Sequence, residues 1–237
     1  MSVSAAERVC IALDFPSRAE VLAAARRFGG RVGWLKIGLE AFVAEGPGLV
    51  EDAAKTGSRI FLDLKFHDIP ATVAGAVAAA GRCGAAMANV HASGGRAMLE
   101  AAREAATRSK LPRLIAVTLL TSLDARALSD LPIAGHPEGI ARRLAVLAKE
   151  CGLDGVVCAA SDLPAIRASC GPDFFTVVPG IRPAGAGAGD QKRVATPAAA
   201  IEAGADLLVI GRPVTAAPDP DAALSSILAE IETAGGA

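Results

Sequence analysis

The stretch Phe61-Leu62-Asp63-Leu64-Lys65-Phe66-His67-Asp68-Ile69-Pro70 decides how the rest of the chain is interpreted. Its first half is rich in phenylalanine and leucine, which predicts a buried β-strand. Pro70 is expected to end this stretch and to open a helix. Because side chains alternate along a strand, Asp63 and Lys65 are expected to point to one side. The leucines then point to the other side, where helices would cover them.

Three charged side chains, Asp63, Lys65 and Asp68, lie close to the end of this predicted strand. Charges inside a packed protein are unfavourable unless they are paired, and a lysine between two carboxylates can be paired. A purely structural ion pair is the alternative interpretation. We favour a functional site, because a surface ion pair would serve that purpose without placing charge at the end of an apolar strand.

The composition is that of a soluble chain with enough apolar residues for a substantial core. Among 237 residues, 52% are hydrophobic and 21% are charged, and the net charge is -1. This balance offers no electrostatic surface for nucleic acid or an anionic membrane, and no segment is long and apolar enough to span a bilayer. The N-terminus shows no signal-peptide pattern. We therefore predict a cytoplasmic protein with one domain over residues 1–237.

Cysteine and histidine are arranged neither for disulfides nor for a metal. The five cysteines are odd in number and include no Cys-x-x-Cys pair, so they are expected to be small core residues in a reducing compartment. The three histidines form no His-x-His or His-Glu-x-x-His pattern. No metal site is predicted.

Short apolar runs alternate with helical patterns along the whole chain. Strands are predicted at residues 9–13, 34–38, 60–65, 87–91, 114–120, 155–159, 174–178 and 207–210. Helices are predicted at residues 16–28, 41–56, 70–83, 95–109, 137–151, 161–169, 197–203 and 220–233. Continuous apolar strands are typical of buried parallel sheets, so this order predicts an α/β fold, a (β/α)8 TIM barrel. A doubly wound open sheet is the alternative, because periodicity alone does not separate the two.

Polar residues gather at the C-terminal ends of these strands, where parallel barrels place their active sites. They end or follow most of the predicted strands: Asp14, Lys36, Asp63, Lys65, Asn89, His91, Thr121, Ser122, Arg182, Gly211 and Arg212. The solubility of loops does not explain polar residues at so many strand ends at once. The pattern predicts an active site at this end of the barrel.

The end of the eighth strand is a candidate phosphate site. Gly211 lets a backbone N–H approach an anion closely, and Arg212 supplies a rigid fork of donors. Taken alone, Arg212 would be interpreted as a solvated surface charge. Arg182 and Gln191 border a loop rich in glycine and alanine, which we expect to be a mobile lid over the same anion.

Together these motifs resemble the family of orotidine 5′-phosphate decarboxylase, which converts orotidine 5′-monophosphate to UMP and CO2. The segment Asp63–Thr72 resembles the signature of that family. The similarity continues in order through residues 12–14, 36–38, 89–92, 117–122, 179–183, 189–191 and 210–213, and so covers nearly the whole chain. One departure from the family pattern is Phe15, where tyrosine is more usual. The substitution is compatible with the same function if the aromatic ring packs and the tyrosine hydroxyl is not needed.

The resemblance implies a role for each matched residue around the reacting carbon. Lys65 would donate a proton to C6 of the pyrimidine ring, and Asp63 and Asp68 would flank it. Asp68 and Thr72 would reach into the active site of the other subunit of a homodimer, so that the two sites are shared. Members of the family use neither a metal nor an organic cofactor, and none is expected here.

The remaining matched residues would bind the nucleotide. Asp14 and Lys36 would contact the ribose hydroxyls, and Thr121-Ser122 would meet the pyrimidine edge. The phosphate would be held by four residues: Arg182, Gln191, Gly211 and Arg212. The implied partner is therefore a small molecule, orotidine 5′-monophosphate.

Two other functions are compatible with parts of the pattern. A sugar-phosphate decarboxylase of the same wider barrel group resembles it through Asp-x-Lys-x-x-Asp, and those relatives use Mg²⁺ to stabilise an enediolate. The continuation His67–Pro70 and the Thr121-Ser122 pair argue against that enzyme. A non-catalytic nucleotide-binding barrel is the second alternative, although binding alone would not require Lys65.

Overall fold

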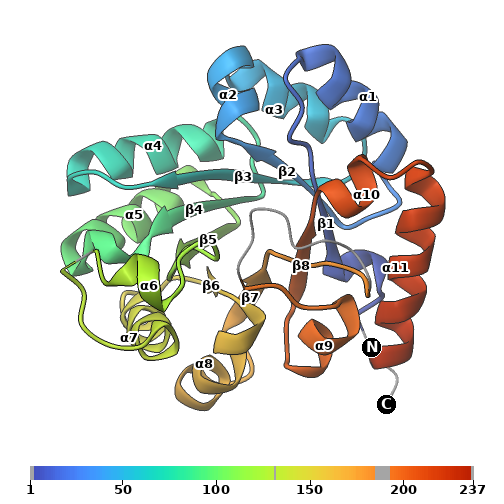
Figure 1. Cartoon of the computed structure of the whole chain (residues 1–237). Coiled ribbons are helices and arrows are strands. Elements are labelled where there is room, and N and C mark those ends of the chain that lie inside the picture. Colours follow the sequence, from blue (N-terminus) through green and yellow to red (C-terminus); the bar gives the residue numbers. More distant parts are fainter. Residues whose placement is uncertain (1–2, 131, 185–192, 236–237) are drawn as a thin grey trace.

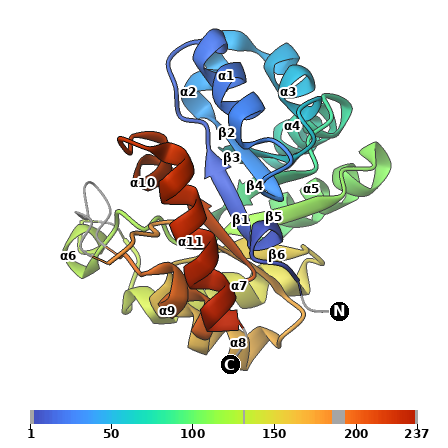
Figure 2. The same cartoon turned by 90° about the vertical axis from the view of Figure 1, so that its right-hand side faces the viewer.

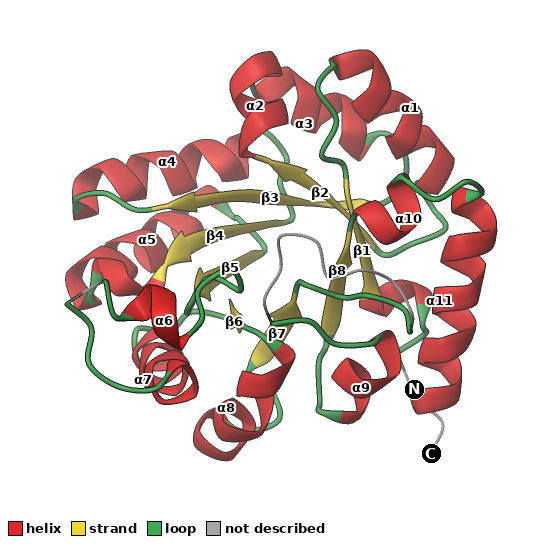
Figure 3. Ribbon diagram, in the orientation of Figure 1, coloured by secondary structure: helices red, strands yellow, loops and turns green. Residues whose placement is uncertain are grey.

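The computed structural model describes residues 3–130, 132–184 and 193–235. Within them, eight parallel strands pair in sequence order and the last pairs with the first, which closes the sheet into a barrel. The strands are β1 (Val9–Ala12), β2 (Trp34–Gly38), β3 (Arg59–Phe66), β4 (Met87–His91), β5 (Arg113–Val117), β6 (Gly155–Val157), β7 (Phe175–Val178) and β8 (Leu207–Ile210). Figure 3 shows them as the inner part of the molecule, with the helices outside. The predicted (β/α)8 barrel is confirmed, and the open-sheet alternative is wrong.

The strands are apolar on both faces because both faces are buried. A core inside the barrel is formed by inward-pointing residues: Cys10, Ala12, Trp34, Phe61, Met87, Ile115, Val177, Leu207 and Val209. The residues that alternate with them, such as Ile11, Leu35 and Leu62, belong to the second core between the sheet and the helices. Burial on both sides is the reason why the strands are continuous apolar runs in the sequence.

A layer of polar side chains lies above the inner apolar core. On the neighbouring strands β2, β3 and β4, the inward-pointing residue that follows the apolar core residue is polar. These polar residues are Lys36, Asp63 and Asn89, respectively. All three side chains are buried. The barrel interior is therefore apolar below and polar toward the C-terminal ends of the strands, where parallel barrels carry their active sites.

Helices cover the barrel from outside. They are α1 (Arg18–Phe28), α2 (Leu39–Glu45), α3 (Pro47–Ala54), α4 (Pro70–Arg82), α5 (Arg96–Ser109), α6 (Ala125–Leu128), α7 (Pro137–Glu150), α8 (Leu163–Cys170), α9 (Pro197–Glu202), α10 (Arg212–Thr215) and α11 (Pro220–Gly235). The described residues also form three 3-10 turns: η1 (Ala6–Arg8), η2 (Ala92–Gly94) and η3 (Ala160–Asp162). Figure 1 shows α4 and α5 packed side by side, and Figure 2 shows α11 on the outside of the barrel next to α9 and α10.

Helix starts follow the local sequence closely. The Ser17 hydroxyl accepts a hydrogen bond from the backbone N–H of Glu20 at the start of α1, and Thr196 caps α9 in the same way through Ala199. Such caps satisfy donors that have no partner within the helix. Proline occupies the first turn of α4 and α7, where its missing N–H and fixed φ are harmless.

The structure differs from the prediction where the chain turns sharply. The single helix predicted at residues 41–56 is two helices, because Gly46 has a φ of +71° and Pro47 begins a new helix. The strand predicted at residues 114–120 ends at Val117, and the residues after it turn toward the mouth of the barrel. The helices α6 and α10 were not predicted, because a single turn carries no apolar periodicity.

Gly155 is the position where pairing within the barrel leaves no room for a side chain. It lies opposite Phe175 of β7, and a Cβ atom at Gly155 would be 2.0 Å from the Phe175 carbonyl oxygen. Gly155→Ala is therefore expected to lower the free energy of unfolding by about 3 kcal/mol, measured by chemical denaturation. Gly139→Ala in α7 is the control, because no atom lies within 4 Å of its added Cβ. Equal stabilities of the two variants would contradict this steric explanation.

The five cysteines are buried and unbridged, as the sequence predicted for small core residues. None of the helices in the described ranges is both long enough and apolar enough to cross a membrane.

Candidate active site

A pocket of about 440 Å³ opens at the C-terminal ends of the strands, a volume typical of small-molecule sites. Its lining includes most of the residues that the sequence predicted: Asp14, Lys36, Asp63, Lys65, Thr121, Ser122, Arg182, Gly211 and Arg212. Apolar side chains such as Phe61, Val117 and Val209 form its floor. The barrel therefore brings together polar residues from both ends of the chain.

Four charged side chains of alternating sign form a row from the end of β1 to the end of β3. The Lys36 ammonium lies 3.0 Å from Asp14 Oδ1 and 3.4 Å from Asp63 Oδ2. The Lys65 ammonium lies 2.7 Å from Asp63 Oδ1. Lys65, which the sequence predicted to lie between Asp63 and Asp68, contacts Asp63 within the single chain. Asp63 in turn lies between Lys65 and Lys36, a second contact that was not predicted.

Burial makes the inner two charges depend on each other. The side chains of Lys36 and Asp63 are 10% and 12% exposed, whereas that of Asp14 is 59% exposed. Burial by itself would lower the pKa of Lys36, but the carboxylates of Asp63 and Asp14 outweigh it and raise that pKa. Burial would likewise raise the pKa of Asp63, but the ammonium groups of Lys36 and Lys65 hold it below its usual value. Both inner groups are therefore stabilised in their charged forms.

The strand β3 is irregular where it carries Lys65. Leu62 pairs with Ala88 of β4. The next pair joins Phe66 with Val90, so four residues of β3 (62 to 66) advance against two of β4 (88 to 90). Lys65 lies in this interval with a φ of +50°, a value that residues with a side chain rarely adopt. Such a conformation persists only where surrounding contacts hold it.

Asn89 contacts β3 across this irregular interval. Its side-chain oxygen accepts a hydrogen bond of 2.8 Å from the backbone N–H of Lys65. Its amide nitrogen donates a hydrogen bond of 2.7 Å to Asp63 Oδ1. Asn89 is fully buried, and the sequence reasoning noted it at a strand end without giving it a role.

Two arginines contribute to the pocket from strands on the other side of the ring. Arg182 follows β7, which lies across the barrel from β3, and Arg212 begins α10 directly after β8. Burial and the neighbouring charge of Arg212 lower the pKa of Arg182. Two positive groups that line one pocket favour the binding of an anion there. Gln191 and the rest of the loop predicted to be a lid, from residue 185 on, lie outside the described residues.

The loop after β5 carries Thr121 and Ser122 into the pocket. Arg193 holds this loop, because its guanidinium donates to the backbone carbonyls at positions 119 and 120. Arg193 also pairs with the buried carboxylate of Asp162 at 2.8 Å. The sequence did not reveal this anchor, because Arg193, Asp162 and the loop are distant in the chain and no local pattern links them.

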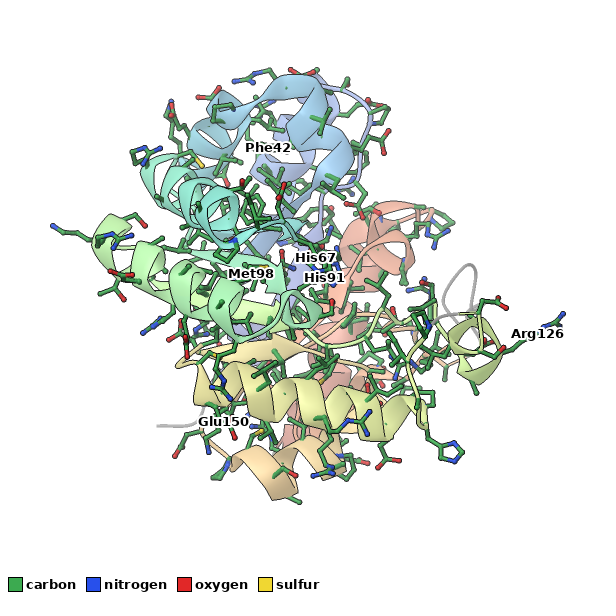
Figure 4. All side chains as sticks on the ribbon, turned by 90° about the vertical axis from the view of Figure 1, so that its left-hand side faces the viewer. Phe42, His67, His91, Met98, Arg126 and Glu150 are labelled. Carbon is green, nitrogen blue, oxygen red and sulfur yellow. The ribbon has the colours of Figure 1, made fainter. Side chains whose placement is uncertain are left out.

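Asp68 and Thr72 lie outside the pocket. The Asp68 carboxylate is exposed and accepts a hydrogen bond of 2.6 Å from the backbone N–H of Ile69, and Thr72 is exposed in the first turn of α4. Residues 67–70, 93 and 94 form a shallow hollow here. Figure 4 shows His67 close to His91, with ring centroids 5.2 Å apart. In the single chain, Asp68 and Thr72 therefore face the surface rather than the row of charges.

The acidic groups of the pocket are engaged by lysines. Among the described residues, no three histidine, cysteine, aspartate or glutamate side chains come together in a way that could hold a metal ion. That the reaction needs neither a metal nor an organic cofactor stays a prediction.

The missed contact between Lys36 and Asp63 had a signal in the sequence. Each lies two residues after a large aromatic side chain, Trp34 or Phe61, that fills the barrel interior. The same spacing places Asn89 after Met87. The alternation along three neighbouring strands therefore indicated three inward polar residues, but only their register could show that they touch.

A (β/α)8 barrel that combines a row of alternating acids and lysines with two arginines at the same mouth is an enzyme for a small anionic substrate. Residues 7–227 match the model of the "Orotidine 5'-phosphate decarboxylase / HUMPS family". The chain belongs to this family.

Similar proteins extend over almost the full length of the chain. A protein of Anaeromyxobacter sp. (strain K) named orotidine 5′-phosphate decarboxylase is 53% identical over 94% of this chain and 97% of its own length. One of the same name from Halorhodospira halophila is 52% identical over 99% of this chain and its whole length. The crystal structure of orotidine 5′-phosphate decarboxylase from Lactobacillus acidophilus superposes with a TM-score of 0.84 at 33% identity, over 95% of this chain and 99% of that one. The predicted family is therefore confirmed.

Proposed function

We propose that this pocket decarboxylates orotidine 5′-monophosphate to UMP and CO2, the last step of de novo UMP synthesis, as the sequence motifs predicted. The observation that carries the proposal is the Lys65 ammonium, held 2.7 Å from Asp63 in a pocket that two arginines also line. Membership of the family supports the substrate, since relatives that match almost the whole chain bear the name of this enzyme. The chain is thus a carboxy-lyase.

Lys65 meets the charge that the reaction develops. Decarboxylation breaks the bond between C6 of the pyrimidine and the carboxylate carbon, and the electron pair stays on C6 while CO2 leaves. This pair lies in the plane of the ring, where the π system does not delocalise it. The Lys65 ammonium stabilises it electrostatically and transfers a proton to C6, which forms the C6–H bond of UMP. The amine then regains a proton from water.

Asp63 orients this donor. Its carboxylate is fixed by Lys36 on one oxygen and by Lys65 and Asn89 on the other. A charge that is already in place needs little reorganisation when the transition state forms, which is the main advantage of an active site over water. In this proposal, Asp63 supports the ammonium from one side and Asp68 of a second subunit supports it from the other.

Phosphate binding supplies much of the remaining acceleration. A tenfold change in rate corresponds to about 1.4 kcal/mol, and general acid catalysis contributes only about 10²–10⁴-fold. The rest requires binding energy from parts of the substrate that do not react. The phosphate is held by four residues: Arg182, Gln191, Gly211 and Arg212. The first and last of these are the two arginines that line the pocket.

The sugar and the base fit between the phosphate and Lys65. Asp14 and Lys36 bind the ribose hydroxyls, and this proposal is supported by their position at the pocket with Asp14 more than half exposed. Thr121 and Ser122 face the pyrimidine edge from the loop after β5. Hydroxyl groups both donate and accept hydrogen bonds, which suits the carbonyl and N–H groups of a pyrimidine.

The active enzyme is a homodimer in which Asp68 and Thr72 complete the site of the partner. Two features of the surface support this. Ile69, next to Asp68, is 66% exposed, and Leu39 and Val43 on α2, which follows the neighbouring strand, are 54% and 80% exposed. Exposed apolar side chains bordered by polar ones are typical of interfaces between identical chains.

The enzyme works in the cytoplasm on a small molecule and without nucleic acid. A net charge of -1 gives no electrostatic attraction for a polyanion. Five buried, unbridged cysteines suit a reducing compartment.

An absorbance assay with orotidine 5′-monophosphate in the presence of EDTA tests the proposed reaction. The rate is expected to be the same with and without the chelator, because the stabilising charge belongs to Lys65 rather than to a metal. Activity that EDTA abolishes and Mg²⁺ restores would favour the metal-dependent sugar-phosphate decarboxylases. Binding of UMP without any decarboxylation would favour a non-catalytic nucleotide-binding barrel.

A further inference from the structure

Asn89 is a buried polar residue to which the proposed function assigns no task. It lies at an inward position of β4 and is fully buried. Both hydrogen bonds of its side chain go to the neighbouring strand, one to the Lys65 backbone and one to the Asp63 carboxylate. A single side chain thus joins the proposed proton donor to the acid that orients it.

We infer that Asn89 is a positioning residue for decarboxylation, which holds the Lys65 backbone and the Asp63 carboxylate in one fixed arrangement. The inference rests on the role of Lys65 in the proposed function.

The first contact replaces a hydrogen bond that the strand itself lacks. In a regular parallel ladder, every second backbone N–H of a strand donates to a backbone carbonyl of a given neighbouring strand, at even spacing. Between residues 62 and 66 the pairing of β3 with β4 is interrupted, and Lys65 adopts its φ of +50° there. The Asn89 side-chain oxygen accepts from the Lys65 N–H at 2.8 Å and so takes the place of a backbone carbonyl. It holds the backbone in the conformation from which the Lys65 side chain enters the pocket.

The second contact sets the rotation of the Asp63 carboxylate. Oδ1 accepts hydrogen bonds of 2.7 Å from both Lys65 Nζ and Asn89 Nδ2, and Oδ2 lies 3.4 Å from Lys36 Nζ. The hydrogen bond from Asn89 to Oδ1 keeps Oδ1 directed at Lys65 and Oδ2 directed at Lys36. In the absence of the Asn89 amide, the Asp63 carboxylate is free to rotate toward Lys36, and the Lys65 ammonium moves with it.

The two contacts together require the chemistry of asparagine. The position must accept a hydrogen bond from a backbone N–H and donate one to a carboxylate, and a primary amide offers both groups on one short side chain. Aspartate keeps the acceptor but sets a second carboxylate against Asp63. The charged groups around such a change are Asp63 and Lys65 on β3 and Lys36 on β2, with His91 two residues further on β4.

Two substitutions and one control separate positioning from stability. Asn89→Asp retains an acceptor for the Lys65 N–H and reverses the contact with Asp63, whereas Asn89→Ala removes both contacts without adding charge. Thr176→Val is the matched control. Thr176 is equally buried, and its hydroxyl hydrogen-bonds to Arg167 and Asp206, none of which lines the pocket.

For each variant, kcat and KM are measured with orotidine 5′-monophosphate, the Kd of UMP by calorimetry, and Tm by thermal unfolding. Both Asn89 variants are expected to lose about 100-fold in kcat, the scale of a misplaced catalytic group, while the Kd of UMP keeps its order of magnitude. Thr176→Val is expected to lower Tm and to leave kcat unchanged.

The inference is overturned if the Asn89 variants keep the kcat of the Thr176→Val protein, or if kcat and UMP binding fall together. The Lys65→Ala enzyme, assayed alongside, keeps the two proposals apart. Turnover by Lys65→Ala would refute the proposed role of Lys65 itself. An inactive Lys65→Ala enzyme beside fully active Asn89 variants would refute only the positioning role of Asn89.

Discussion

Lys65→Ala is expected to bind UMP with nearly the affinity of the unaltered enzyme and to decarboxylate orotidine 5′-monophosphate at least about 10⁴-fold more slowly. The loss is large because one ammonium both stabilises the electron pair on C6 and supplies the proton. Binding survives because UMP has no carboxylate and because Arg182 and Arg212 are unchanged. Calorimetry with UMP and an absorbance assay with the substrate measure the two effects.

The structure predicts that this variant still folds. Asp63 keeps Lys36 at 3.4 Å and Asn89 at 2.7 Å, so its buried carboxylate is not left without partners. Lys55→Ala is the control, because Lys55 lies on the surface with its side chain 74% exposed and pairs with the surface carboxylate of Asp52. It is expected to retain full activity. Turnover by Lys65→Ala close to that of Lys55→Ala would remove Lys65 from the mechanism.

Mixing the inactive variants Lys65→Ala and Asp68→Ala is expected to restore about a quarter of the unaltered activity. If Asp68 serves the partner's site, a hybrid dimer of the two variants has one site with both native residues and one site with neither. Random exchange makes half of the dimers hybrids, and half of the sites in each hybrid are intact. Specific activity is measured after the mixed subunits have exchanged.

Two features make this experiment decisive. Asp68 is exposed and lies outside the pocket of its own chain. A loss of activity in Asp68→Ala is therefore explained by the site of a second subunit rather than by the site of the same chain. The control mixes Lys65→Ala with Asp63→Ala, because both residues line the same pocket and no hybrid of these two variants has an intact site. No recovery in the first mixture, once subunit exchange has been verified by mass spectrometry of tagged chains, would mean that the sites are not shared.

Much of the fold was predictable because local rules decide it. The predicted strands end close to charged residues such as Asp14, as the observed strands do. Proline or a capping serine marks the predicted helix starts, and the observed helices begin close to these residues. The prediction failed at Gly46, where a positive φ divides one amphipathic pattern into two helices. It also missed α6 and α10, which are too short for a periodic signal.

The candidate site was predictable in its members but not in its contacts. The motifs named Lys36, Asp63 and Lys65, yet assigned Lys36 to the ribose alone and left Asn89 without a role. The structure places Lys36 against Asp63 and places Asn89 across an irregular interval of β3. Arg193 and Asp162, which hold the loop after β5, belong to no motif that the sequence analysis used.

By itself, the sequence determined the order of alternating strands and helices, predicted a (β/α)8 barrel from that order, and showed which residue types follow its strands and which family the motifs resemble. These properties follow from periodicity, strand ends and short motifs, and each of them is local in the chain. Only the tertiary structure decided which charges touch, that Asp63 lies between two lysines, and that Asn89 spans two strands. Strand register and barrel closure set those contacts, because they bring together residues that no local stretch of sequence relates.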